Sequence, residues 1–514
     1  MSDMNEEGRP EANPWDELFA AHCEFLNALE CIHEMFTTVS PVLASKDHER
    51  EDRIKEISQE FEQSETDGKL VLRISSIDKL RELTWHLRHV RRADRMFRQN
   101  AVVSIVSKFD EFLVAVLRCA FEKNTSWLKH PEKTVTYKQL FETESLEDFI
   151  SDLILKEVDQ LMRGSHHAQV DLLDTKLKLG IAKEFAQWRQ FLEITDQFLE
   201  ITERRNLFVH NAGKVNSIYR ENAERFGFAG TEDRVLSATD AYVSEAIDVF
   251  YEISVRIAQG AARRLFPECR TDADYALINR SAELLKDERW DLAERILQYA
   301  LGIPEKLRAD PELKYYATIN LCIALKFSDQ DMSNVLGTID WTPFHPKYHF
   351  AVAILEDRFS DAAELMRTEA VRNKVDQDDL LNWPLLREFR KSREFQDAFS
   401  ELYGKQVADK LLEQARDEIK GQQSEECEAT EEDIRTTYPL DYRELTLRLA
   451  DRYSDFKANG VYHALRKSVR ENGKYVKRQN LSPGNPKSQA KEYYSEAILD
   501  LFDKHYTRSA AEES

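Results

Sequence analysis

Apolar side chains recur at helical spacing in several long stretches of the chain. The clearest stretch runs from Ala101 to Phe121. Its apolar positions are Val102, Ile105, Val106, Phe109, Phe112, Leu113 and Val116. Steps of three and four residues place such side chains on one face of a helix. The pattern therefore predicts an amphipathic helix over residues 101–121.

The same spacing predicts helices on both sides of this stretch. An amphipathic helix is expected over residues 15–36, and a charged helical stretch from about residue 50 to residue 62. Another helix is expected over residues 147–161, and a further one carries Phe191, Ile194, Phe198 and Ile201 at helical spacing. Between the last two, Gly164 is followed by Ser165, His166 and His167, which we interpret as a helix cap.

Polar residues interrupt the apolar face of the helix that carries Phe198. At about 100° per residue, Arg205 projects within about 40° of the apolar stripe. A permanently charged guanidinium there costs free energy unless it is paired or meets an anion. Asn206 and His210 are four residues apart and therefore neighbours on a second face. Asn211 and Gly213 predict the end of the helix.

Arg205 and His210 do not share a helix face. On a straight helix they point about 140° apart and lie ~7.5 Å apart along the axis. They act together only if the helix bends at its end, or if a second copy of the chain completes the site.

The motif Arg205-Asn206-x-x-x-His210 resembles the Arg-polar-x-x-x-His signature of HEPN-domain ribonucleases. The order of the surrounding helices, over roughly residues 76–265, is similar to HEPN proteins of bacterial defence systems. In that family the helices dimerise, and two motifs face each other in a metal-independent site that cleaves RNA. The resemblance therefore implies a homodimer and an RNA substrate, with no metal and no cofactor.

The residue types of the motif suit this chemistry. RNA carries its own nucleophile, the 2′-hydroxyl, so cleavage needs a proton shuttle and a cation for the phosphate. We assign His210 as general acid/base, Arg205 as phosphate clamp and Asn206 as the residue that orients His210 or the phosphate. Arg204 is expected to be an auxiliary nucleic-acid-binding cation. The alternative is that Arg and His only stabilise the helix C-terminus, worth ~0.3–1 kcal/mol each.

From about residue 266 the pattern changes to short helical hairpins. Residues 287–293 parallel residues 356–362 at an offset of 69, and residues 395–398 repeat residues 359–362 at an offset of 36. A period of 34 to 36 residues, with one missing or drifted copy, resembles a tetratricopeptide array. An aromatic residue and a small Ala are expected to fill each hairpin interior. The resemblance implies a module that binds a protein, here a regulatory protein, or packs on its neighbour.

Charge is distributed unevenly along the chain, whose net charge is −22. An acidic run in residues 425–433 is followed by a basic C-terminal segment. The nucleic-acid-binding candidates in that segment are Arg466, Lys467, Arg470, Lys474, Lys477 and Arg478. A strand over residues 473–478, a turn over 481–486 and a closing helix over 488–505 are predicted, a small α+β unit that resembles a winged helix. A basic domain that docks on the acidic body is the alternative.

A second basic stretch introduces the helices of the central bundle. Its arginines are Arg81, Arg88, Arg91, Arg92, Arg95 and Arg98. We interpret it as a solvated helix face, with contact to RNA as the alternative.

The composition favours a mainly α-helical protein, because Gly and Pro number only 15 and 13 in 514 residues. The expected division is an N-terminal helical segment (1–75), a HEPN-like bundle (76–265), tetratricopeptide-like repeats (266–420), an acidic linker (421–436) and a basic C-terminal domain (437–514). The N-terminus lacks the apolar core of a signal peptide, and the best apolar segment is too charged to span a membrane. Six scattered cysteines are typical of a reducing compartment, so a cytoplasmic location without membrane contact is expected.

Two functions are consistent with these features. The first is a metal-independent endoribonuclease of the HEPN type, a toxin-like effector in bacterial antiphage defence or in a toxin–antitoxin system. The second is a dimeric scaffold without catalytic activity, which uses the bundle for dimerisation, the repeats for a partner and the basic tail for nucleic acid.

Overall fold

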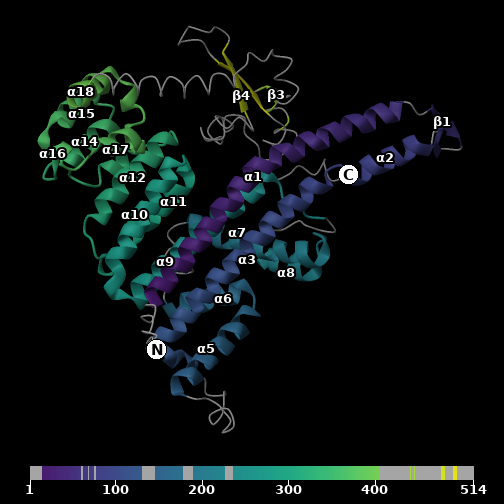
Figure 1. The fold of residues 1–514 in the computed structure, drawn as a ribbon, viewed down its shortest axis with the longest axis horizontal. Coiled ribbons are helices and arrows are strands. Elements are labelled where there is room, and N and C mark those ends of the chain that lie inside the picture. The colour runs from purple at the N-terminus through teal and green to yellow at the C-terminus, as the bar shows by residue number, and fades with distance from the viewer. Residues whose placement is uncertain are drawn as a thin grey trace, which may run out of the picture. The chain divides into compact units, whose positions relative to one another are not determined.

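The structure is a computed structural model, and its helices and strands are drawn in Figure 1. It describes residues 14–59, 62–66, 69–73, 77–129, 145–177, 189–225 and 235–404, and short segments between residues 440 and 494. Most of these residues are helical, which confirms a mainly α fold. The chain divides into two compact units, residues 1–277 with 302–311 and residues 278–301 with 312–514.

The first unit is a helical bundle. Its helices are α1 (Pro14–Gln59), α2 (Ile77–His89), α3 (Arg92–Lys123), α5 (Leu146–Met162), α6 (His166–Leu177), α7 (Arg189–Asn211), α8 (Ser217–Arg225), α9 (Asp240–Leu265) and the first part of α10 (Arg270–Lys286). An antiparallel hairpin of β1 (Glu62–Thr66) and β2 (Lys69–Arg73) joins α1 to α2. Short 3-10 turns lie at Thr125–Leu128, Pro267–Cys269 and Glu305–Leu307. The predicted helix over residues 147–161 is α5, and it is confirmed.

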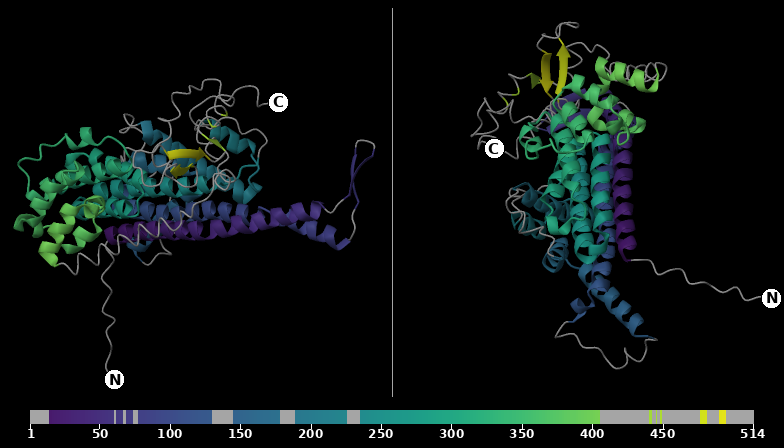
Figure 2. Two further views of the ribbon diagram at one scale, coloured as in Figure 1. Left: turned by 90° about the horizontal axis from the view of Figure 1, so that it is seen from above. Right: turned by 90° about the vertical axis from the view of Figure 1, so that its left-hand side faces the viewer.

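The first helix, α1, is one continuous element of 46 residues. The separation between residues 36 and 50 that the sequence suggested is therefore wrong. Pro41 lies inside α1 and removes one backbone donor, but the helix continues because it packs along its length on α3 and α9. Both views in Figure 2 show α1 beside α3. The first compact unit therefore includes α1, whereas the sequence predicts a separate N-terminal segment over residues 1–75.

The core of the bundle is centred on α3. All seven apolar positions predicted for this helix are buried, which confirms its amphipathic pattern. The Phe109 ring meets Phe198 of α7 at 5.2 Å and Phe250 of α9 at 5.1 Å, both edge to face. Phe25 of α1 approaches the same ring at 5.7 Å. Helices α1, α7 and α9 are therefore held on α3 by one aromatic cluster.

The helices described in the second unit are short. They are the second part of α10, α11 (Trp290–Gly302), α12 (Leu313–Phe327), α13 (Ser333–Leu336), α14 (Pro346–Leu355), α15 (Phe359–Arg367), α16 (Glu369–Arg372), α17 (Gln377–Asn382) and α18 (Arg393–Tyr403), with 3-10 turns at Pro384–Leu386 and Phe389–Lys391. The predicted interior alanines, Ala293, Ala362 and Ala398, are fully buried.

Three turns of the second unit share one backbone conformation. Glu288, Asp329 and Asp357 have φ values of 57°, 59° and 58°. In each case the next amide nitrogen donates to a carbonyl five residues earlier, at 2.8 to 2.9 Å. The repeat over residues 287–293 and 356–362 places Glu288 and Asp357 at equivalent positions. The turn at Asp329 lies between them, in a segment whose side chains differ too much for the pattern to reveal it.

Three short strands belong to the C-terminal segment. They are β3 (Leu440–Asp441), β4 (Val476–Asn480) and β5 (Ala490–Tyr494), antiparallel in the order β3-β5-β4. The strand β4 overlaps the strand predicted over 473–478 and contains Lys477 and Arg478. The closing helix predicted over 488–505 is wrong for residues 490–494, where paired β5 ends in two tyrosines, which favour strands. Arg466, Lys467, Arg470 and Lys474 lie outside the described residues, as does the turn at 481–486.

Within the described ranges, no helix combines the length and the hydropathy needed to cross a bilayer.

Candidate functional site

Helix α7 carries the motif and ends where the sequence predicts. It is helical through Asn211, after which Ala212 and Gly213 take left-handed backbone with φ values of 49° and 82°. The amide nitrogen of Gly213 donates to the carbonyl oxygen of Leu207 at 3.0 Å, a six-residue closure typical of a helix end. Because α7 stays helical through Asn211, the side chains of Arg205 and His210 point about 140° apart.

Arg205 faces α3 rather than open solvent. Its Nη2 atom lies 3.7 Å from Oδ2 of Asp110, and its Nη1 atom donates to Oδ1 of Asn206 at 3.2 Å. The side chain is 23% exposed. Its Nε atom is buried and has no hydrogen-bond partner in the described part of the chain. The predicted cost of a cation on the apolar stripe is thus offset by one carboxylate, and part of the guanidinium's donor capacity is unused.

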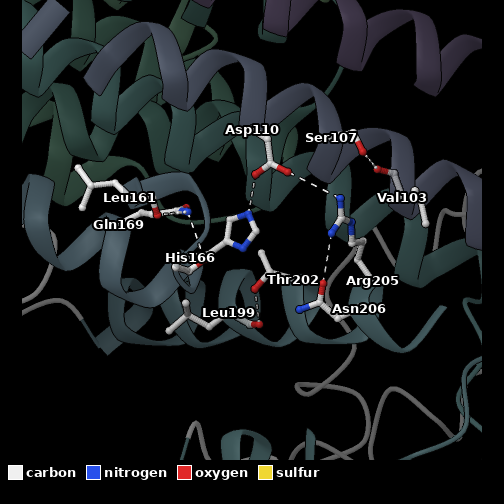
Figure 3. A network of polar contacts seen from close by, with 11 residues as sticks. Val103, Ser107, Asp110, Leu161, His166, Gln169, Leu199, Thr202, Arg205 and Asn206 are labelled. Carbon is white, nitrogen blue, oxygen red and sulfur yellow. Dashed lines mark hydrogen bonds and ion pairs between the residues drawn. The ribbon is translucent and has the colours of Figure 1, made fainter. Parts of the chain in front are cut away.

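Asp110 also holds a histidine. The Nε2 atom of His166, at the start of α6, lies 2.8 Å from Oδ1 of Asp110. The His166 ring is largely buried, and it lies near the rings of Phe109 and Phe198. Figure 3 shows that one carboxylate on α3 connects the imidazole on α6 with the guanidinium on α7. An imidazole oriented by a carboxylate is an arrangement that suits proton transfer.

Asn206 lies beside Arg205 rather than beside His210. Its side-chain oxygen accepts the hydrogen bond from Arg205, so its amide group orients the guanidinium. The sequence predicted that Asn206 orients His210 or the phosphate. No hydrogen bond joins it to His210 in the described residues.

His210 occupies the last turn of α7 and is exposed. It has no hydrogen-bond or ion-pair partner among the residues that the structure describes. Within one chain, the structure therefore brings Arg205 together with Asn206, Asp110 and His166, and it leaves His210 on the surface.

Arg204 belongs to a separate buried network. Its guanidinium lies 2.6 Å from Oε1 of Glu200 and 4.1 Å from the centre of the Tyr242 ring. The hydroxyls of Tyr219 and Tyr242 also donate to Glu200, at 2.5 and 2.8 Å. Burial and the Glu200 carboxylate both raise the pKa values of Tyr219 and Tyr242. Burial opposes the charge of Arg204, but Tyr242 and Glu200 raise its pKa above the ordinary value.

These contacts tie Arg204 to the interior of the protein. A guanidinium that is paired with a buried carboxylate and stacked on a ring is not free to bind a phosphate. They favour a structural role for Arg204 over the predicted role as an auxiliary nucleic-acid-binding cation.

Sequence reasoning missed Asp110, the carboxylate partner of Arg205, and His166, which contacts the same carboxylate. Asp110 occurs in the predicted helix over 101–121, where the local spacing does not mark it as a partner of Arg205. His166 was assigned to a helix cap. Ser165 does cap α6, since its hydroxyl accepts from the amide of Ala168 at 3.3 Å, but His166 points to Asp110. The sequence does contain one signal for these contacts. Asp110, His166 and Arg205 are polar residues in three helices of one bundle.

No family model, no curated protein and no solved structure matches this chain.

Proposed function

We propose that the protein is a metal-independent endoribonuclease of the HEPN type. The observation that carries the proposal is the position of Arg205. Its guanidinium is permanently charged and partly exposed, with the Asp110 carboxylate at 3.7 Å and an Nε atom that has no hydrogen-bond partner among the described residues. That separation is longer than a close charge-assisted hydrogen bond of about 2.7–2.9 Å. An RNA phosphate therefore competes for the guanidinium without displacing a tight ion pair.

Two imidazoles supply the proton transfers. RNA cleavage by its own 2′-hydroxyl needs one group to accept the hydroxyl proton and one to protonate the leaving 5′-oxygen. His166 is oriented by Asp110 at 2.8 Å and lies in the same network as Arg205. His210 is exposed at the end of α7. We assign His210 as the general acid/base of the motif and His166 as the second proton-transferring group.

A second copy of the chain completes the site in this proposal. His210 points about 140° away from Arg205 on one helix, so the two do not act on one phosphate within a single α7. A two-fold arrangement brings the His210 of one protomer to the Arg205 of the other. The exposure of His210 leaves it accessible to such a partner.

The biological role proposed for this activity is that of a toxin-like effector, in antiphage defence or in a toxin–antitoxin system. A regulatory protein bound to the tetratricopeptide-like helices of the second unit would hold the enzyme inactive. The basic C-terminal segment, including Lys477 and Arg478 of β4, would contact nucleic acid.

A second candidate function is a non-catalytic dimeric scaffold. The contact between Asp110 and Arg205 favours it, because an internal carboxylate already neutralises the guanidinium. In this case the Arg205 network only stabilises the packing of α3, α6 and α7, and the bundle serves as a dimerisation module.

Cleavage of total RNA in EDTA separates the two candidates. The parent protein is compared with Arg205→Ala and His210→Ala, and with the exposed-site controls Arg220→Ala and His48→Ala. Loss of an acid/base group lowers the rate by about 10²–10⁴-fold, and loss of a donor that stabilises the transition state lowers it by about 10²–10³-fold. We expect such losses in His210→Ala and Arg205→Ala and none in the controls. An inactive parent, or equal activity in all four variants, would end the enzyme proposal.

A further inference from the structure

A pocket rich in arginine lies where α2 meets α3. Its volume is about 550 Å³, and Arg88, Arg91, Arg92, Arg95 and Arg98 line it together with one carboxyl, Asp94. The remaining wall includes Ser237 and Ala238, which precede α9. The turn between the helices depends on Arg91, whose φ of 56° is left-handed. Five guanidiniums around one hollow surface strongly favour a ligand with several negative charges.

Two of the five arginines are engaged by the protein, and three are not. Arg98 pairs with Asp94 at 2.7 Å and with Asp240 at 2.8 Å, and Arg91 pairs with Glu51 at 2.7 Å. Arg88, Arg92 and Arg95 are exposed and make no ion pair within the described ranges. The paired arginines hold the shape of the pocket, and the three unpaired ones provide its free charge.

The lining also indicates which part of a ligand the pocket takes. Ligand pockets for whole small molecules are lined mainly by apolar and aromatic side chains. Among the lining residues that the structure describes, arginines dominate and none is aromatic. Arginine forks match phosphate oxygens in geometry and charge. The pocket therefore suits phosphate groups rather than a complete nucleotide with its base.

An exposed tryptophan lies one helical turn before the pocket. Trp85 precedes Arg88 by three residues on α2, so the two side chains are neighbours on the helix surface. The Trp85 side chain is 50% exposed, and its ring stacks on His89 at 4.4 Å. An exposed tryptophan beside exposed arginines is the combination with which proteins bind single-stranded nucleic acid, by stacking bases and pairing phosphates.

The pocket wall is bonded to the helix that carries the candidate site. The carbonyl oxygen of Ser237 accepts from Arg204, the residue directly before Arg205. The amide of Leu236 donates to the carbonyl oxygen of Gly213 at 2.8 Å, just after the end of α7. A strand that occupies the pocket therefore lies against the segment that contacts both Arg204 and the C-terminal end of α7.

We infer that the arginine pocket binds the phosphate backbone of a single-stranded RNA and that Trp85 stacks on one of its bases. The identity of the strand as RNA rests on the function proposed above. The binding itself requires no cleavage, and it is measured separately from it.

The test is fluorescence anisotropy with a labelled 2′-O-methyl oligoribonucleotide of about 20 nucleotides, longer than the site sizes known for single-strand binding folds. This probe lacks the 2′-hydroxyl nucleophile, so binding is measured without cleavage. The full-length protein is compared with the triple variant Arg88→Gln, Arg92→Gln, Arg95→Gln and with Trp85→Leu. A matched control replaces three exposed arginines elsewhere, Arg220, Arg372 and Arg393, with Gln.

We expect the pocket variant to weaken binding at least about 10-fold and to lower the slope of log K against log salt by about 2, at ~0.7 per lost phosphate contact. Trp85→Leu should weaken binding about 5-fold or more. The control variant should bind like the parent.

Equal weakening by the control and the pocket variants would overturn the inference, since only net charge would then matter. Competition by ATP or inorganic triphosphate at equimolar concentration with the probe would also overturn it, because the site would then prefer a free phosphate compound. If the parent binds as expected but cuts no RNA in EDTA, the pocket inference stands and the proposed ribonuclease fails.

Discussion

The Nε2 atom of His166 lies 2.8 Å from the Oδ1 atom of Asp110, although α3 and α6 are separated by more than forty residues of sequence. The other oxygen of that carboxylate lies 3.7 Å from Arg205. Asp110 therefore orients both the imidazole and the guanidinium. Both contacts are partly buried.

Replacing Asp110 with Asn tests this arrangement. The amide is nearly the same size but carries no charge, so it no longer orients His166 or balances Arg205. We expect RNA cleavage to fall at least about 10-fold, since the orienting carboxylate of a catalytic histidine contributes this much or more. Unfolding stability should change by less than about 1 kcal/mol, because the pair is partly exposed.

The matched control for Asp110→Asn is Glu111→Gln on the same helix. Glu111 forms an exposed pair with Lys108 at 2.8 Å and does not face the site. Full RNA-cleaving activity of Asp110→Asn, or an equal loss of activity in Glu111→Gln, would mean that the contact between Asp110 and His166 contributes only to packing.

Mixing two inactive variants tests whether the site forms between protomers. Arg205→Ala and His210→Ala are each expected to be inactive. In a mixed dimer, one of the two composite sites keeps both residues. Random exchange of protomers should therefore restore about a quarter of the parental activity.

The control for the mixing experiment is each variant incubated alone through the same exchange procedure. A mixture as inactive as its components would show that Arg205 and His210 do not act across a two-fold interface with one pair of residues per site.

The sequence predicts much of the bundle because helical periodicity is a local property. The buried face of α3 and the end of α7 at Asn211 follow from spacing and from Gly213 alone. The continuity of α1 did not follow, since Pro41 and the charged residues beyond it suggest a break. Packing on α3 and α9 decides that case, and this packing has no local signal. The same reason explains β5, where pairing with β4 overrides helical spacing.

The candidate site was predictable only in part. Arg205 is conspicuous because it lies on an apolar stripe, and the sequence therefore identifies it as a residue that needs a partner. The partner cannot be read from the sequence, because Asp110 meets Arg205 and His166 only after α3, α6 and α7 pack. Conversely, Arg204 looks like an auxiliary cation in the sequence, and only the contact with the buried Glu200 favours a structural role.

A buried ion pair should dominate the stability of the α9–α10 junction. Asp274 accepts from Nη1 of Arg263 at 2.5 Å, and its other oxygen accepts from the amides of Ala309 and Asp310 at 2.9 Å each. Both side chains of the pair are almost completely buried. Removing one partner leaves an uncompensated buried charge, so Asp274→Ala should destabilise the protein by about 3–5 kcal/mol.

The measurement for Asp274→Ala is the midpoint of urea unfolding, compared with Glu283→Ala. Glu283 pairs with Arg280 at 2.8 Å in an exposed position, so its removal should cost less than about 1 kcal/mol. Equal shifts in the two variants would contradict the dominance of the buried pair.

The cysteines should differ in their reaction with iodoacetamide as the pH rises. Burial raises the pKa values of Cys119 and Cys322 to about 12 each. A raised pKa keeps a thiol protonated and unreactive throughout the alkaline range below that value. In the folded protein at about pH 8.5, mass spectrometry should find Cys31, which is exposed, alkylated well before Cys119 and Cys322. In urea, all three should react alike.

Only a glycine at position 213 allows the backbone to approach Leu236 this closely. A Cβ atom built on it would lie 2.6 Å from the carbonyl oxygen of Leu236, and the backbone there has a φ of 82°. Leu236 leads directly into Ser237 and Ala238, which line the arginine pocket. A methyl group added at position 213 would therefore push the arginine pocket away from the helix that bears His210. A bound strand would then be misaligned, although every residue that contacts it would still be present.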